Sequence, residues 1–89
     1  MIMNVRQILT ELAEKWNAEF EEAKHGPPMY ILAKLNFLML YYPKPLFATV
    51  IITDSETHEI ATIFTKKVKP SELEKFVNKW LLIALTGYL

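Results

Sequence analysis

The chain has 89 residues, which leaves room for a single domain, and we expect residues 1–89 to fold as one compact unit. Hydrophobic residues make up 52% of the sequence and charged residues 22%, a composition that excludes intrinsic disorder. Ten Lys and Arg balance ten Asp and Glu, so the formal net charge is zero, which argues against a strongly basic nucleic-acid module. Cysteine is absent, which excludes disulfides, thiolate zinc sites and cysteine nucleophiles.

The N-terminal residues pass directly into an amphipathic pattern, without the basic leader and apolar block of a secretory signal. No unbroken apolar run approaches the roughly 18 residues that a membrane-spanning helix needs. We therefore expect a cytoplasmic protein with no membrane contact.

Residues 4–24 predict one amphipathic helix, because apolar side chains recur there at spacings of three and four. Asn4 is a favourable N-cap, and Gln7 three residues later completes a capping-box pattern. Gly26, followed by two prolines, marks the end of this helix.

Residues 30–42 predict a strand, although their Leu, Met and Ala content leaves a helix as the alternative. Lys34 and Asn36 decide between the two. On a helix they would point about 200° apart and give no polar face, whereas on a strand a spacing of two puts them on the same face.

Two further strands are predicted at residues 46–53 and 59–67, which are rich in β-branched residues. The polar run Asp54-Ser55-Glu56-Thr57 lies between them, so an antiparallel hairpin is expected.

A second helix is predicted from Pro70 to Gly87, with Ser71 and Glu74 as its capping box. The element order is then α-β-β-β-α. This order indicates an α+β domain with a three-stranded antiparallel sheet and two helices packed on one face.

The sequence carries more apolar side chains than this architecture can bury. Either the loops and C-terminus fold back over them, or they form a surface for a second copy or another protein. The second interpretation predicts a homodimer whose interface contains Leu81, Leu82, Leu85, Tyr30, Leu38 and Leu40.

No pattern in the sequence predicts catalysis, a metal site or a cofactor. His25 and His58 are the only histidines; the first suits a helix C-terminus and the second lies in a polar turn. Neither Ser55 nor Ser71 lies in a glycine-flanked nucleophile motif, and the two glycines are too far apart for a phosphate-binding loop. We expect the chain not to be an enzyme.

Residues 65–79 carry a net charge of +3, five lysines against Glu72 and Glu74. The α-β-β-β-α order with Lys66, Lys67 and Lys69 before the last helix resembles the double-stranded RNA-binding domain. The chain departs from that family at two places. Glutamates occupy the first turn of the last helix, and the connector Pro43-Lys44-Pro45 lacks the family's histidine.

The sequence therefore predicts a small homodimerising or protein–protein interaction domain. The alternative is binding of RNA or DNA through Lys66, Lys67 and Lys69, which would weaken steeply as the salt concentration rises.

Overall fold

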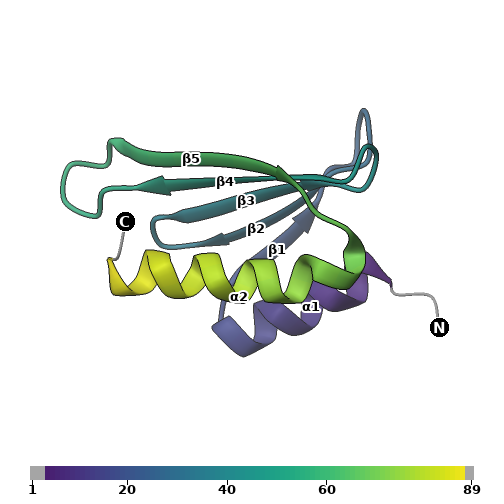
Figure 1. The fold of residues 1–89 in the computed structure, drawn as a ribbon, viewed down its shortest axis with the longest axis horizontal. Helices are drawn as coiled ribbons and strands as arrows, with labels where there is room; N and C mark the ends of the chain where they lie inside the picture. The colour runs from purple at the N-terminus through teal and green to yellow at the C-terminus, as the bar shows by residue number, and fades with distance from the viewer. Residues whose placement is uncertain (1–3, 88–89) are drawn as a thin grey trace.

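The computed structural model describes residues 4–87 and shows two helices and a five-stranded antiparallel sheet (Figure 1). The elements in chain order are α1 (Val5–Trp16), β1 (Glu19–Glu22), β2 (Tyr30–Lys34), β3 (Phe37–Tyr42), β4 (Phe47–Thr53), β5 (Ile60–Lys67) and α2 (Pro70–Thr86). The strands lie in the sheet in sequence order, β1 to β5. The predicted α+β class is confirmed. The predicted three-stranded sheet is wrong, because two predicted segments contain an additional strand.

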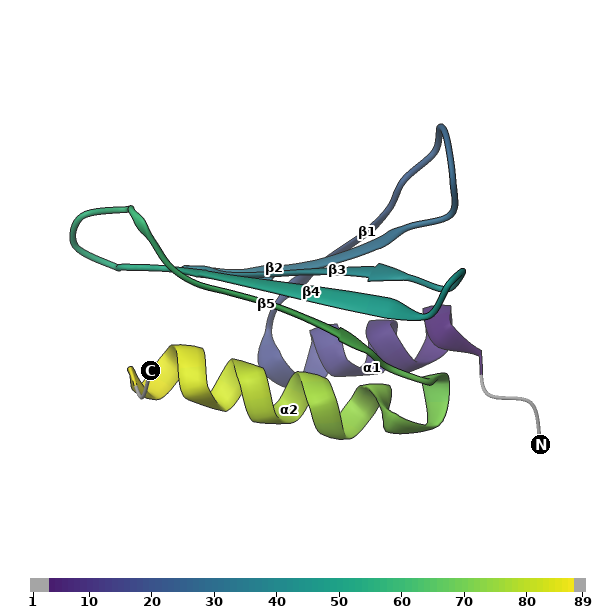
Figure 2. The same ribbon diagram turned by 45° about the horizontal axis from the view of Figure 1, so that its top comes forward.

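Both helices lie on the same face of the sheet, side by side and running in the same direction (Figures 1 and 2). Two polar contacts join them at Asn78 of α2, whose Oδ1 accepts from the indole nitrogen of Trp16 at 2.7 Å and from Lys15 Nζ at 3.3 Å. The opposite face of the sheet carries no helix in either view.

The hydrophobic core fills the layer between this sheet face and the helices. Its largest fully buried side chains come from both layers: Tyr41, Phe37, Leu9, Leu32, Met39, Ile52, Leu73, Leu81, Val50, Val68 and Val77. Alternate residues of β3 and β4 are buried, as expected when only one face of a strand is covered.

The predicted helix over residues 4–24 ends early, at Trp16. Asn17 adopts a left-handed conformation with φ 53°, and its backbone N–H and that of Ala18 bond back to the last turn of the helix. The chain then enters β1, where Phe20 stacks on Tyr30 of β2 with ring centroids 6.0 Å apart. Trp16 and Phe20 fit a helical spacing, but the alternation around Phe20 fits a strand equally well, and pairing with β2 decides the outcome.

The predicted strand over residues 30–42 is a hairpin. Lys34 of β2 pairs with Phe37 of β3, and Leu35 turns the chain with φ 50°. The two polar residues that suggested one polar strand face have separate partners. Lys34 Nζ donates to the carbonyl oxygens at the end of α1, and Asn36 Nδ2 donates to the Thr53 carbonyl at 2.8 Å.

Helix α2 begins at Pro70, one residue before the predicted cap. Glu72, rather than Glu74, accepts the backbone N–H of Lys69 at 3.1 Å, so Ser71 is not the N-cap. The predicted end at Gly87 is confirmed, with φ 77° and a bond from its N–H to the Ile83 carbonyl. With five strands between the helices, the element order on which the resemblance to the double-stranded RNA-binding domain rested is absent.

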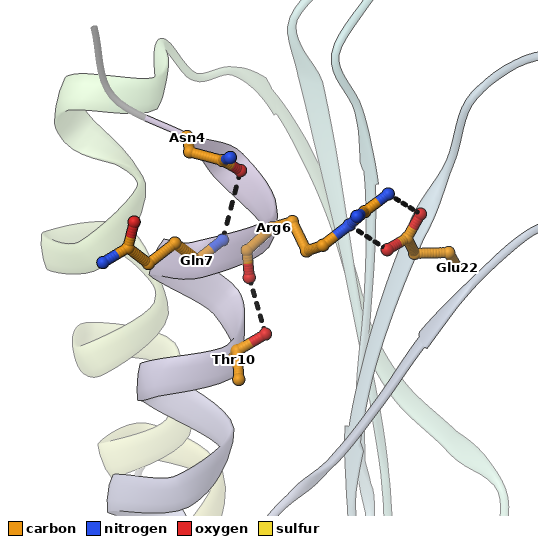
Figure 3. A network of polar contacts seen from close by, with 5 residues as sticks. All are labelled: Asn4, Arg6, Gln7, Thr10 and Glu22. Carbon is orange, nitrogen blue, oxygen red and sulfur yellow. Dashed lines mark hydrogen bonds and ion pairs between the residues drawn. The ribbon is translucent and has the colours of Figure 1, made fainter.

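An ion pair joins the N-terminal helix to the edge strand β1, and further polar contacts lie within the helix and its cap (Figure 3). Asn4 accepts the backbone N–H of Gln7 as the predicted N-cap, while the Gln7 side chain donates to Glu11 instead of closing a capping box. The Arg6 guanidinium forms a two-point ion pair with Glu22 of β1, which raises the pKa of Arg6 through the hydrogen bond and the opposite charge. This pair fixes the start of α1 against β1.

The buried Tyr41 makes the free energy of unfolding depend on pH in the alkaline range. Its hydroxyl is buried and donates to the Val68 carbonyl at 2.8 Å, and burial followed by the charge of Glu72 raises the pKa of Tyr41 above its ordinary value of 10.0. Because the unfolded chain loses this proton first, the stability from Tyr41 is complete below pH 10.0 and is lost as pH rises toward the raised pKa.

We expect Tyr41→Phe to lower the free energy of unfolding by about 1 kcal/mol at neutral pH, since the Val68 carbonyl loses its donor. Urea unfolding followed by circular dichroism should show the difference between the two proteins shrinking above pH 10. The rest of the chain is identical in the two proteins, so a difference that stays constant with pH would contradict this account.

Candidate functional site

The first candidate surface is the uncovered face of the sheet. The strand register places one row of side chains directly across four strands on this face: Ala33, Leu38, Ile51 and Ile63. The next row adds Ile31 and Leu40 beside the hydrogen-bonded pair Thr49 and Thr65, and the row beyond it adds Phe47 between Tyr42 and Lys67. We define the open face by its six residues without a polar side-chain group, apart from Ala33: Ile31, Leu38, Leu40, Phe47, Ile51 and Ile63.

The open face differs sharply in exposure from the helix-covered face. Leu32, Met39 and Val50 beneath the helices have no exposed surface. On the open face, Ile63 is 60% exposed and Phe47 is also exposed, while the remaining members are half-buried by one another. Single exposed apolar residues are ordinary on protein surfaces, but a contiguous patch across four strands is typical of an interaction surface.

The six predicted interface residues do not form one surface. Leu38 and Leu40 belong to the open face, whereas Tyr30 lies on the helix-covered side and packs against the core. Leu81 is fully buried in the core, so its assignment to an interface is wrong. Leu82 and Leu85 are exposed on α2, away from the open face.

Tyr30 lies on the opposite sheet face from Leu38 and Leu40 because residues 30–42 form a hairpin and not the single predicted strand. A single strand would put all three on one side, but the turn at Leu35 and Asn36 makes Tyr30 pair with Tyr41 of the covered face. The members missed in the predicted strands over residues 46–53 and 59–67 could have been found from their alternation. Ile51 points to the same face as Thr49, and Ile63 points to the same face as Thr65.

The second candidate surface is a groove between β5 and α2 with a volume of about 410 Å³. It is lined by Phe64, Lys66, Lys67, Val68, Ser71, Glu72, Lys75, Phe76, Lys79 and Trp80, and we call it the basic groove. Four lysines against one glutamate give the lining a net charge of +3.

Three aromatic rings form the floor of the basic groove. The Phe64 ring centroid lies 5.0 Å from that of Trp80 and 6.4 Å from that of Phe76, and Phe76 and Trp80 are 6.4 Å apart. Lys79 Nζ lies 5.9 Å from the Trp80 ring centroid, a cation–π contact. The groove therefore joins an apolar floor to a cationic rim.

The predicted lysine cluster is only partly gathered in this groove. Strand alternation places Lys66 and Lys67 on opposite faces of β5, although both border the groove, and Lys69 does not line it. Lys75 and Lys79 were not predicted as site residues, and their helical spacing of four was the signal that puts them on one side of α2. Nucleic-acid binding through Lys66, Lys67 and Lys69 stays a prediction.

The polar turn between β4 and β5 has a structural role. Asp54 accepts the backbone N–H groups of Thr57 and Glu56, which lowers the pKa of Asp54, and His58 donates its own N–H to the Asp54 carbonyl. No group of three or more His, Asp or Glu side chains converges anywhere in residues 4–87.

Searches of the chain against protein-family models, curated proteins and solved structures find no match. Among residues 4–87, neither helix has the length and apolar content needed to cross a membrane.

The cationic rim should be detectable through Trp80 in a Trp16→Phe chain, where Trp80 is the remaining tryptophan. We expect iodide to quench Trp80 fluorescence at least about twofold more efficiently than caesium at low salt, because the lysines concentrate the anion. The Lys75→Glu, Lys79→Glu double variant should reverse this order. Equal quenching by the two ions in both proteins would show that the lysines do not set the potential at Trp80.

Proposed function

We propose that the chain acts as a homodimerising interaction domain in which two copies pack open face against open face. The observation that supports this proposal is the continuous apolar surface across β2, β3, β4 and β5, on the side of the sheet without a helix. A second copy would supply the layer that the helices supply on the covered face.

The size of the open face suits such a contact. At about 4.8 Å between strands and about 3.3 Å per residue, the four strands of the open face present roughly 19 by 20 Å. Side-chain relief and the flanking charged residues of β1 and β5 add to this projected area of roughly 380 Å² and bring the contact toward the about 600 Å² per partner that small specific interfaces bury. The proposal is therefore a small interface with an apolar centre.

The charges at the two sheet edges favour one arrangement of the copies. Glu19 and Glu21 lie on the uncovered side of β1, and Lys67 lies on the same side of β5. A two-fold axis parallel to the strands places β1 of one copy over β5 of the other, so that glutamates face lysine. An axis perpendicular to the strands places β1 over β1 and brings like charges together.

The helical leucines make a poorer self-association surface. Leu82 is 55% exposed and Leu85 is 38% exposed, but the other neighbours of Leu82 one turn away on α2 are the polar residues Asn78, Lys79 and Thr86. Two leucines flanked by polar side chains make a smaller apolar centre than the open face. The cytoplasmic location expected from the sequence stays a prediction.

We expect Leu38→Glu to convert the dimer to a monomer, because it places a charge at the centre of an apolar contact. Sedimentation equilibrium should show at least a hundredfold weaker association, and circular dichroism should show a folded chain. Leu82→Glu makes the same chemical change outside the open face and should leave the association unchanged. A monomeric wild-type chain at tens of micromolar would refute the proposal, and so would dissociation by Leu82→Glu but not by Leu38→Glu.

Charge reversal tests the orientation of the copies. Glu21→Lys and Lys67→Glu should each weaken association several-fold at low salt, since each replaces an attraction across the interface by a repulsion. The double variant should recover most of the loss, because the two charges have exchanged places. Additive losses in the double variant would contradict the axis parallel to the strands.

A further inference from the structure

The outer edge of β5 has unpaired backbone groups. In the described part of the chain β5 pairs only with β4, and the Val68 N–H at its end bonds to the Leu46 carbonyl of the β4 side. In an antiparallel ladder alternate residues turn their backbone groups toward the partner strand. The N–H and C=O groups of Ile63, Thr65 and Lys67 therefore point outward.

The basic groove runs directly below this edge. Lys66 of β5 borders it on one side, and Lys75 and Lys79 of α2 border it on the other, beside the aromatic floor. A strand added to β5 would turn alternate side chains down into the groove, because successive side chains of a strand point to opposite faces.

The positive charge of the groove lining indicates which kind of strand would bind at this edge. A second copy pairing β5 with β5 would bring two lysine-rich edges together, an arrangement that lysines on edge strands disfavour. The one acidic residue in the lining, Glu72, already accepts the Lys69 backbone N–H and caps α2. The rim thus presents positive charge that is complementary to carboxylates.

We propose that the basic groove and the edge of β5 bind an extended acidic peptide segment, which adds to the sheet as a sixth strand. Its backbone pairs with Ile63, Thr65 and Lys67. Its apolar side chains contact the aromatic floor formed by Phe64 and Trp80, and its carboxylates lie near the lysines of α2. This site differs from the open face, because an added strand extends the sheet sideways, and the two adjoin at Ile63 and Lys67, whose side chains lie on the open side of β5.

A peptide fits these features better than a polynucleotide does. The edge offers alternating donors and acceptors at the spacing of a peptide backbone, which a sugar-phosphate chain does not match. Four of the ten Lys and Arg residues line this groove, whereas the formal charge of the whole chain is zero, unlike that of a strongly basic nucleic-acid module.

The probe is a short peptide with glutamate and valine in turn at every second position and threonine between them, so that both kinds of side chain face the groove. It is titrated into the full-length Trp16→Phe chain while Trp80 fluorescence is followed. We expect saturable binding that weakens as salt rises. We also expect slower hydrogen exchange at the backbone amides of Ile63, Thr65 and Lys67. The same peptide with N-methyl groups along one edge has lost the donors that pair with β5, and it should bind at least tenfold more weakly.

The variants test whether peptide binding depends on the lysines of the groove and not on lysines elsewhere in the chain. Lys75→Glu and Lys79→Glu should each weaken peptide binding at least tenfold, whereas Lys24→Glu, in the loop between β1 and β2, should leave it unchanged. Absence of binding, equal binding of the N-methylated peptide, or equal loss in Lys24→Glu would overturn the proposal. Tighter binding of a single-stranded oligonucleotide than of the peptide would also overturn it, in favour of a nucleic-acid site.

Discussion

Both helices pack against the same face of the five-stranded sheet, because β3 and β4 alternate strictly between side chains that the helices bury and side chains that they do not. On the covered side this pattern gives a buried hydrophobic core, in which the Tyr41 hydroxyl donates a hydrogen bond to the Val68 carbonyl. On the other side it leaves aliphatic residues where a solvated sheet would carry polar ones. The proposed dimer follows from this one-sided coverage.

The two proposed surfaces have different physical origins. The open face depends on apolar area and would contribute mainly through removal of that area from water. The basic groove depends on unpaired backbone groups and lysine charge above an aromatic floor, so its contribution should depend on salt. One chain can therefore hold a second copy on its sheet face and a peptide at its edge. Substitution of Leu38 addresses the first contact and substitution of Lys75 or Lys79 the second, whereas Lys67 belongs to both.

The sequence predicted the fold class, both helix starts to within a residue or two, and the strands on either side of the Asp54 turn. It failed where two patterns fit the same residues. Phe20 satisfies a helical spacing from Trp16 and also the alternation of β1, and only pairing with Tyr30 and its strand selects the second. The turn at Leu35 was missed because leucine rarely adopts a left-handed conformation, so nothing local marked it.

The candidate surfaces were predicted less completely than the fold, and for the same reason. Without a turn at Leu35, a single strand assigns the side chains of β2 to the opposite sheet faces, and Tyr30 is then predicted on the wrong face. Leu81 was misassigned because the last turns of α2 are apolar all round, so periodicity could not separate its buried side from its exposed side. The basic groove needs the approach of β5 to α2, a tertiary contact that spacing along the chain does not contain.

The most direct test of the account is the solvent accessibility of leucine and isoleucine methyl groups, measured by NMR with a soluble paramagnetic probe over a dilution series. The account predicts that Leu38, Leu40 and Ile51 are shielded at high protein concentration and become accessible on dilution, while Leu82 stays accessible throughout. If the methyl groups of the open face are equally accessible at every concentration, no second copy covers them and the central claim is wrong.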